Sequence, residues 1–488
     1  MSDHRVLVGG VDVSTSHFID GQRVTSSTTF EDRSPLDWTI KLADVARGGP
    51  TEAHAAVSAA VEAFDGWAAL STAERQAYLH RLAELIDANI ERLATVECLD
   101  MAMLLESLRL RVITRGARNF RAYADLAVAY EPRRWDSNGT HNTVLRMPAG
   151  PTVVITPWNA PFMLSTWKCA PALAAGNTVV LKPAEWSPLS CSLLMDLVAE
   201  SDFPPGVFNM VQGFGEEVGA ALVSDPRVRR ISFTGSPETG RVIGVAAAQN
   251  LVPFTAELGG KGPFVVFADA DLDLAAQKAA LMYDDAGQVC LAGTRLLVES
   301  RCRTEFLELL TAATARHVLG DSRDGATTVS PLIHPQHLER VQGFVERSFD
   351  AGDQLIFGGT RPSDAGLWFE PTLIEPRSND AEIVQREVFG PVLTLQTFNT
   401  EAQAIALANS TPYGLSAMVF TSDQARADRF ANGVRAGTIW VNCFLVRDLT
   451  APFGGTGISG IGREGGDYAL DFYSDVKTYQ VKEETTHG

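Results

Sequence analysis

The chain has 488 residues, 45% of them hydrophobic and 20% charged, an ordinary globular composition that excludes dominant disorder. Its 41 basic and 59 acidic residues give a formal net charge of -18, which argues against nucleic-acid binding and against docking on anionic lipid. The six cysteines form no C-x-x-C pair and the histidines no H-x-x-x-H, so no metal site is predicted and a reducing cytoplasm is expected. His334 and His337 are three residues apart, and we predict a solvated surface pair.

At about 150 residues per domain, the length predicts about three domains. The first fifty residues favour strand and loop, and Ala-rich periodic segments predict helices over 52–66 and 73–97, the second capped near Ser71. Residues 147–167 carry no charge, but four prolines would break a membrane-spanning helix, so strand and loop are predicted there. The N-terminus lacks a signal-peptide pattern.

After residue 150, short apolar strands alternate with helical segments. Strands are predicted over 152–155, 178–181, 207–211, 230–233, 264–267 and 295–298, and intervening helices include those near 216–224 and 238–248. This alternation predicts an α/β fold with mostly parallel sheets, covered by helices on both faces, that bind ligands beyond the carboxyl ends of the strands. A second α/β stretch runs from about 260 to 455, and the tail after about 470 is predicted to be an edge strand.

Generic nucleotide motifs are missing. The glycines from Gly213 miss G-x-G-x-x-G by one residue, and neither a P-loop nor a G-x-S-x-G elbow is present. Cys290 follows a glycine turn and is a candidate nucleophile, although most lone cysteines are inert core residues. Glu257 is either a functional carboxylate or a solvated strand end, and Asn159 is either functional or bonded to turn backbone.

Seven segments nevertheless follow one another in a specific order. They are Ile-Thr-Pro-Trp-Asn at 155–159, Leu-Lys-Pro-Ala-Glu at 181–185, Phe-Thr-Gly-Ser-x-x-x-Gly at 233–240, Glu-Leu-Gly-Gly-Lys at 257–261, Gly-Gln-Val-Cys at 287–290, Glu-x-Phe-Gly-Pro at 387–391 and Pro-Phe-Gly-Gly at 452–455. In this order they resemble the NAD(P)-dependent aldehyde dehydrogenases over nearly the whole chain.

The resemblance implies a fold with three parts. A Rossmann-like NAD-binding domain would comprise residues 1–125 and 149–259, and an α/β catalytic domain would comprise 260–458. A small β oligomerisation arm would join 126–148 to 459–488. Neither piece of the arm looks stable alone, so a homodimer or homotetramer is expected.

The resemblance also implies the chemistry. Cys290 would attack the aldehyde to give a thiohemiacetal, while the amide of Asn159 and the backbone N–H of Cys290 stabilise the oxyanion. After hydride transfer leaves a thioester, Glu257 would activate the hydrolytic water. Lys168 is the fourth catalytic candidate.

The candidate cofactor site follows the same motifs. The predicted cofactor-binding residues are Ile155, Thr156, Pro157, Trp158, Lys182, Glu185, Gly215, Phe233, Thr234, Gly235, Ser236, Leu258, Glu387 and Phe389. Lys182 and Glu185 would hold the adenosine ribose, and because a carboxylate there repels a 2′-phosphate, NAD is favoured over NADP. Ser236 would face the pyrophosphate at a helix N-terminus, and Glu387 would hold the nicotinamide ribose.

Arg447 narrows the choice of substrate class. Its loop resembles that of the family branch that oxidises 2-hydroxymuconic, 2-aminomuconic and 5-carboxymethyl-2-hydroxymuconic semialdehydes in aromatic catabolism, whose carboxylates a guanidinium can hold. A second arginine would also face the substrate. It is Arg115, or instead Arg118 or Arg121, because one sequence does not fix the phase of the helix. The predicted substrate-binding residues are Arg447, Arg115, Phe162, Trp167, Val289, Leu291 and Phe453. The alternatives are a neutral aromatic or aliphatic aldehyde, betaine aldehyde, a CoA-acylating enzyme and a non-catalytic relative.

Overall fold

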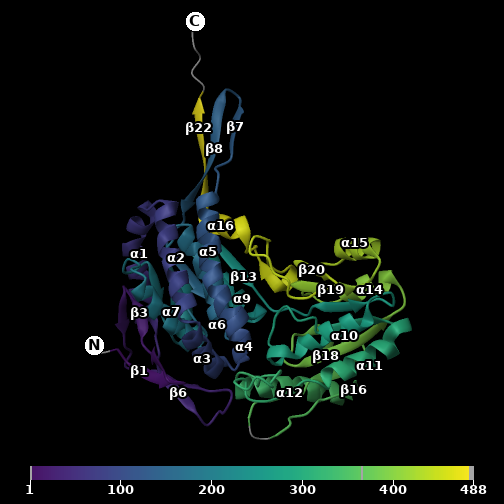
Figure 1. Cartoon of the computed structure of the whole chain (residues 1–488). Helices are drawn as coiled ribbons and strands as arrows, with labels where there is room; N and C mark the ends of the chain where they lie inside the picture. The colour runs from purple at the N-terminus through teal and green to yellow at the C-terminus, as the bar shows by residue number, and fades with distance from the viewer. Residues whose placement is uncertain (1–2, 364–365, 483–488) are drawn as a thin grey trace.

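Two α/β units lie side by side, and a narrow ribbon of strands projects from the first unit, away from the rest of the molecule (Figure 1). The computed structural model describes residues 3–363 and 366–482. The parts of the predicted ranges at 1–2, 364–365 and 483–488 lie outside the described residues.

The first unit is built on an eight-stranded sheet. In spatial order its strands are β21 (Gly460–Ile461), β13 (Phe254–Glu257), β12 (Arg230–Thr234), β9 (Thr152–Ile155), β10 (Val179–Lys182), β11 (Phe208–Met210), β3 (His17–Ile19) and β4 (Gln22–Val24). The five strands from β13 to β11 are parallel, and the flanking pairs are antiparallel. The predicted mostly parallel sheet and its four strands between 152 and 233 are therefore confirmed.

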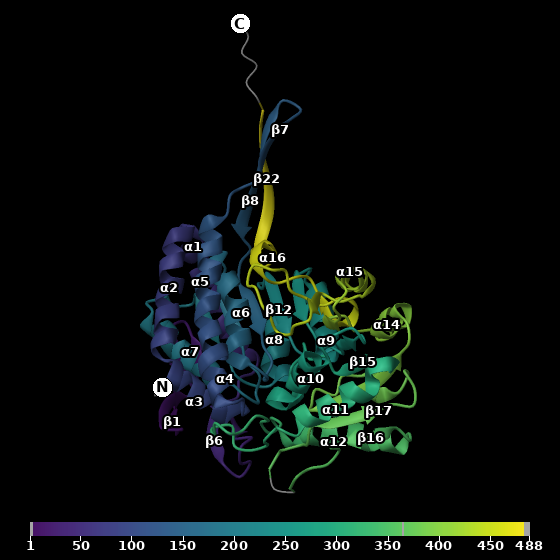
Figure 2. The same ribbon diagram turned by 45° about the vertical axis from the view of Figure 1, so that its right-hand side comes forward.

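Each face of this sheet carries its own helices, and strand periodicity explains the division (Figure 2). In β9, Val154 joins one core, while Val153 and Ile155 join the other. The helices of the Val154 face are α2 (Thr72–Ala88), α3 (Ile90–Met101), α5 (Ile113–Ala129), α6 (Pro161–Ala174) and α7 (Leu189–Glu200). The helices of the other face are α1 (Pro50–Ala69), α8 (Ala220–Ser224) and α9 (Pro237–Gln249). Since both faces are covered, the central strands β9 and β10 are buried throughout and mostly apolar.

Two local predictions need correction. The predicted helix 73–97 is two helices, because Asn89 has non-helical backbone angles of φ -119° and ψ 19° and separates α2 from α3. The predicted cap is confirmed, since Ser71 and Glu74 form a capping box. Residues 161–167 are the start of α6 rather than strand or loop, because Pro161 occupies the first turn, where proline needs no N–H partner. Within the described ranges, no helix is both long and apolar enough to cross a membrane.

The second unit contains a seven-stranded sheet. In spatial order its strands are β16 (Gln354–Phe357), β17 (Thr372–Glu375), β18 (Val392–Phe398), β15 (Arg295–Glu299), β14 (Pro263–Val266), β19 (Ser416–Phe420) and β20 (Thr438–Val441), of which only β16 is antiparallel to its neighbour. One face packs against α10 (Leu272–Ala280) and α11 (Arg303–Thr314). The other face packs against α14 (Glu401–Ala408) and α15 (Gln424–Gly433).

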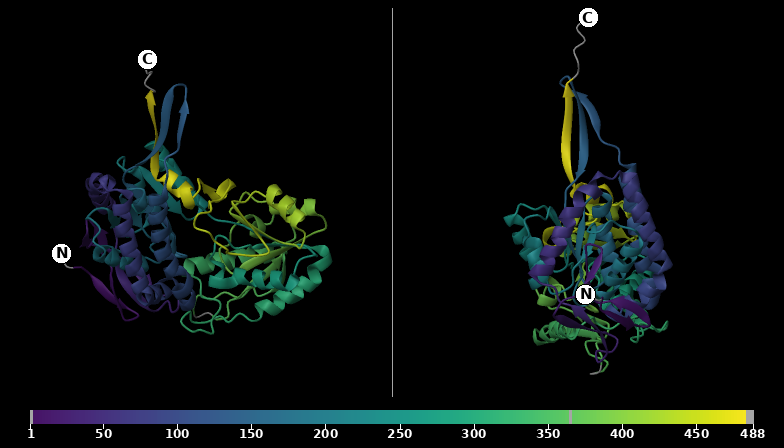
Figure 3. Two further views of the ribbon diagram at one scale, coloured as in Figure 1. Left: turned by 45° about the horizontal axis from the view of Figure 1, so that its top comes forward. Right: turned by 90° about the vertical axis from the view of Figure 1, so that its left-hand side faces the viewer.

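The projecting ribbon is a three-stranded antiparallel sheet, β22 (Ser474–Lys482), β8 (Thr140–Pro148) and β7 (Arg134–Ser137) (Figure 3). The start of the range grouped with the arm in the sequence, 459–473, packs against the first unit instead. Its β21 extends the first sheet, and α16 (Gly466–Phe472) contacts α6.

Candidate active site

The predicted motifs meet because parallel strands end at one edge of a sheet. In the first sheet, Ile155 lies opposite both Lys182 and Phe233, and Thr234 lies opposite Glu257. These residues are the last positions of four neighbouring strands, or next to the last, so segments spread along the chain from Ile155 to Glu257 share one edge.

The loop before Cys290 has a strained backbone. Asp285, Ala286 and Gly287 all have positive φ, at 51°, 53° and 67°. A Cβ on Gly287 would lie 2.3 Å from the carbonyl oxygen of Gly390, so the loop packs directly on the second unit's Glu-x-Phe-Gly-Pro segment. Burial raises the pKa of the Cys290 thiol to about 12, and the resting thiol is therefore protonated at neutral pH.

Asn159 is oriented toward this loop by a hydrogen bond. Its Nδ2 donates to the carbonyl oxygen of Gln288 at 2.9 Å, and the Gln288 side-chain oxygen in turn accepts from the backbone N–H of Ile333 at 3.0 Å. An amide nitrogen has two hydrogens. One hydrogen bonds to the loop that carries Cys290, and the other makes no hydrogen bond to a described residue, so it can donate to a further oxygen.

Glu257 ends β13 and is 5% exposed. Among the described residues, neither of its carboxylate oxygens has a hydrogen-bond partner. Burial, and after it the negative charge of Glu464, raises the pKa of Glu257 well above its ordinary value. A Cβ on Gly454 would lie 2.8 Å from Glu257 Oε1, so glycine at that position leaves room for the carboxylate.

Lys168 does not lie free beside the thiol. It is 1% exposed, forms an ion pair with Glu464 and donates to Ser232 Oγ at 3.1 Å. Glu464 also accepts from Trp167 Nε1 at 2.6 Å, and its backbone pairs with that of Phe453. The sequence analysis missed Glu464, for which the only signal was a charged pair between glycines, Gly462-Arg463-Glu464-Gly465-Gly466.

The predicted adenosine and nicotinamide positions carry the polar groups that a dinucleotide needs. Lys182 Nζ donates to Glu185 Oε2 at 2.9 Å, and Ser236 is the N-cap of α9. In the second unit, Glu387 Oε1 accepts from the backbone N–H of Gly260 at 2.8 Å, and burial raises the pKa of Glu387 to about 7. The remaining candidates lie at or after the carboxyl ends of β9, β11, β12 and β13, apart from Phe389, which contacts Trp158 from the second unit: Ile155, Thr156, Pro157, Trp158, Gly215, Phe233, Thr234, Gly235, Leu258 and Phe389. The donor set therefore fits a bound dinucleotide.

Two arginines converge on one tryptophan. The guanidinium carbons of Arg115 and Arg447 lie 5.5 and 5.8 Å from the Trp167 ring centroid, and that of Arg447 lies 3.8 Å from the Phe453 ring centroid. Of the three arginines left open along α5, Arg115 is the one that lies on this tryptophan. Arg118 is exposed, and Arg121 pairs with Asp87 at 2.6 Å on the outer surface.

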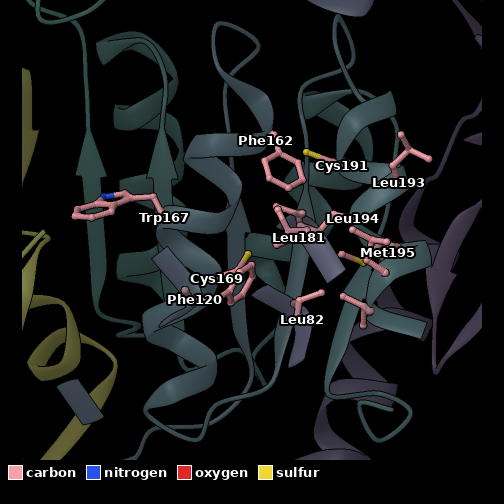
Figure 4. Close-up of a cluster of buried hydrophobic side chains, with 14 of the residues drawn as sticks. Leu82, Phe120, Phe162, Trp167, Cys169, Leu181, Cys191, Leu193, Leu194 and Met195 are labelled. Atoms are coloured by element: carbon pink, nitrogen blue, oxygen red, sulfur yellow. The ribbon is translucent and has the colours of Figure 1, made fainter. Parts of the chain in front are cut away.

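Three other residues predicted to bind the substrate lie in hydrophobic cores, two of them beside Cys290 and one away from it. Val289 and Leu291 flank Cys290 and pack with it against the core of the second unit. Phe162 is fully buried in the core of the first unit, where Figure 4 shows it near Cys191, so its prediction as a substrate contact is wrong. Its ring fills the space left by Gly116.

The prediction of a solvated His334 and His337 pair is also wrong. The His334 ring stacks on Trp186, with centroids 4.4 Å apart, and His337 is 5% exposed. Both belong to the start of α12 (Pro335–Asp350), where it meets the first unit. A three-residue spacing could not reveal this contact, because the covering rings come from distant parts of the chain.

Comparisons with known proteins agree over nearly the whole chain. The model of the aldehyde dehydrogenase family matches residues 23–479. A 2-hydroxymuconic semialdehyde dehydrogenase of Pseudomonas sp. (strain CF600) is 41% identical over 482 residues, 96% of this chain and 99% of that protein. A betaine aldehyde dehydrogenase of Bacillus subtilis (strain 168) is 40% identical, with 95% and 97% covered. The P. syringae indole-3-acetaldehyde dehydrogenase, solved with NAD+ and IAA, has a TM-score of 0.94 at 37% identity, covering 96% of this chain and 97% of that chain.

Proposed function

The chain belongs to the aldehyde dehydrogenase family and oxidises aldehydes with NAD, and we propose that its substrate is an aldehyde that also carries a carboxylate. Semialdehydes such as 2-hydroxymuconic semialdehyde or 5-carboxymethyl-2-hydroxymuconic semialdehyde, formed in aromatic catabolism, have this chemistry. The observation that carries the proposal is the pair of arginines on Trp167.

Within residues 3–363 and 366–482, neither arginine forms an ion pair with an acidic side chain. Arg115 Nε donates to Asn119 Oδ1 at 3.0 Å, and its guanidinium lies on the Trp167 ring. Arg447 contacts the rings of Trp167 and Phe453, and the carboxyl groups of Glu257 and Glu464 act on it from beyond ion-pair distance. Burial, and after it the charge of Arg447, lowers the pKa of Arg115 to about 10. Two like charges in a partly buried place are unfavourable unless an anion joins them. A substrate carboxylate would supply that anion.

The same charges argue against the alternatives. A betaine aldehyde would bring a quaternary ammonium toward two guanidinium groups, which repel it. A neutral aldehyde would gain nothing from either arginine. Betaine aldehyde is thus the less favoured substrate here, although one relative at 40% identity is named for it.

Acylation uses the groups around Cys290. The thiol first loses its proton to solvent, because the thiolate is the nucleophile and burial keeps the resting group neutral. The sulfur then bonds to the aldehyde carbon, and the oxyanion accepts hydrogen bonds from Asn159 Nδ2 and the Cys290 backbone N–H. NAD, when bound by the residues described above, would supply the hydride acceptor. The C–H bond breaks and a thioester remains on Cys290.

Deacylation uses Glu257. As a carboxylate it takes a proton from water, whose oxygen attacks the thioester carbon, releasing the acid and the Cys290 thiolate. A hydrolytic base has no use in a CoA-acylating enzyme, and the intact set of Cys290, Glu257 and Asn159 argues against a non-catalytic relative. Lys168 pairs with Glu464, and the two charges act on Glu257 in opposite directions: Glu464 raises its pKa and Lys168 lowers it.

The charge at the adenosine end of the cofactor site bears on the choice between NAD and NADP. Glu185, paired with Lys182, would bind the adenosine ribose hydroxyls and repel a 2′-phosphate, which favours NAD over NADP.

In the projecting sheet, β22 and β7 are the outer strands. Such edges favour pairing with another copy, as in a homodimer or homotetramer.

A kinetic panel tests the substrate class. Values of kcat/KM are compared for a carboxylate-bearing semialdehyde, a neutral aldehyde of similar size and betaine aldehyde, each with NAD and NADP. The carboxylate-bearing substrate should be preferred by at least about 30-fold. Equal values for the carboxylate-bearing and neutral aldehydes would refute the carboxylate proposal and leave the general activity intact.

A further inference from the structure

We infer that helix α12 holds the Glu387–Gly390 segment in its working shape, and that His337 is the positioning residue that does so at Phe389. This inference rests on the proposed role of Glu387 and Phe389 in binding the nicotinamide ribose. It adds a residue that neither the motifs nor the reaction scheme assigns.

Phe389 needs an external restraint. Its φ of 63° lies in the left-handed region, which is unfavourable for a side chain of this size. Such a conformation persists only where neighbouring groups over-determine it. The Phe389 ring contacts the Trp158 ring edge-on, at 5.3 Å between centroids, but a ring contact does not fix the backbone.

His337 supplies a backbone restraint. Its Nε2 lies 2.7 Å from the carbonyl oxygen of Phe389, and since a carbonyl only accepts, Nε2 carries the hydrogen. Burial lowers the pKa of His337 to about 4, which keeps the ring neutral at physiological pH. One turn further, Arg340 donates to the carbonyl oxygen of Glu387 at 2.7 Å. The first turns of α12 therefore hold both ends of the Glu387-to-Phe389 segment.

The same helix links this segment to the nucleophile loop. A Cβ on Gly390 would lie 2.6 Å from Val341 of α12, and a Cβ on Gly287 would lie 2.3 Å from the Gly390 carbonyl oxygen. Gly390 is thus packed between α12 and the turn that precedes Cys290. A displacement of the segment would therefore disturb both the ribose site and the nucleophile.

The start of α12 is itself fixed to the first unit. His334 stacks on Trp186 and meets Trp38 edge-on, with centroids 4.8 Å apart, while the His337 ring contacts Trp158 at 5.2 Å. All three tryptophans come from the first unit, and α12 belongs to the second. We call the contacts of His337 and Arg340 with the Glu387–Gly390 segment the clamp. Because α12 is fixed to the first unit, the clamp sets the position of this segment relative to the sheet edge that holds the other half of the proposed dinucleotide site.

The test compares two replacements of His337. His337→Leu removes the donor, whereas His337→Gln keeps an amide N–H at a similar reach. The readouts are the NAD dissociation constant from calorimetry, the single-turnover NADH burst rate and the melting temperature without ligand. We expect His337→Leu to slow the burst by roughly 10- to 100-fold and to weaken NAD binding less, with His337→Gln within about threefold of the parent.

The outcomes separate the clamp from the proposed site. If His337→Leu matches the parent in burst rate, or if His337→Gln is as impaired as His337→Leu, the inference is wrong. Should His337→Leu fail to fold, the exposed Arg340→Met variant tests the same clamp, and an unchanged burst rate there overturns it. Glu387→Gln is measured in parallel, and normal NAD binding and burst rate in that variant would reject the ribose assignment instead.

Discussion

The guanidinium of Arg447 lies on the face of the Phe453 ring, 3.8 Å from its centroid, and forms no ion pair with any described residue. Aromatic side chains exclude water and so strengthen the attraction between the guanidinium and an anion bound to it. Phe453 pairs through its backbone with Glu464, so the loop between Arg447 and Phe453 is connected to a buried carboxylate whose charge acts on Glu257.

Arg447→Ala should weaken carboxylate recognition selectively. Losing one partly buried guanidinium–carboxylate pair costs about 2–4 kcal/mol, or roughly 30- to 1000-fold in kcat/KM for a carboxylate-bearing semialdehyde. A neutral aldehyde of similar size should change by less than about threefold, because it makes no such pair. Equal losses for both substrates would mean that Arg447 has a structural role.

Arg115 and Arg118 provide a matched pair on one helix. Arg115→Ala should lower kcat/KM for the carboxylate-bearing substrate by about tenfold, because its guanidinium faces Trp167 beside Arg447. Arg118→Ala should have no effect, since Arg118 is exposed. A loss in Arg118→Ala with none in Arg115→Ala would contradict this placement.

The reactivity of Cys290 should depend on pH and on Arg447. Because the pKa of the thiol is about 12, alkylation by iodoacetamide without NAD should rise by about tenfold per pH unit from neutral pH upward, with no plateau near pH 8. Arg447 lowers this pKa, so Arg447→Ala should slow alkylation at any fixed pH. Cys290→Ala should abolish both alkylation at this site and NADH production, while NAD still binds.

Glu464→Gln should shift the pH dependence of deacylation. Glu257 works as a carboxylate, so a raised pKa means that deacylation rises with pH through that pKa. Removing the negative charge of Glu464 lowers the pKa of Glu257, and the rising limb should move to lower pH. The measurement is steady-state turnover against pH, with Glu257→Gln, which should lose the limb, as the control. A limb that stays in place would show that Glu464 does not act on Glu257.

Gly454→Ala should disturb the base without disturbing the nucleophile. The added Cβ would lie 2.8 Å from Glu257 Oε1 and 2.9 Å from the Gly462 carbonyl, at a φ of 154°. We expect steady-state turnover to fall by about 10- to 100-fold while the NADH burst persists, because acylation does not require Glu257 in position. Loss of the burst together with turnover would show that the substitution damages the whole site.

The sequence by itself determined the fold class, the parallel strands and the segments that meet at the sheet edge. Strand and helix periodicity is local, and Cys290, Glu257, Asn159 and Lys182 stand in short motifs whose order suffices for the resemblance. The capping box at Ser71 was likewise readable from four consecutive positions.

Only the tertiary structure decided which side chains pair across distance. Glu464 reaches Trp167 across 297 positions, and His337 reaches the Phe389 carbonyl across 52, so neither contact leaves a local pattern. The choice of Arg115 over Arg121 depends on the phase of α5, which the sequence of a helix with several arginines does not fix. The burial of Phe162 depends on how α6 packs against its neighbours. Such phases are settled when α5 and α6 pack against each other, because packing, rather than local propensity, selects the buried face.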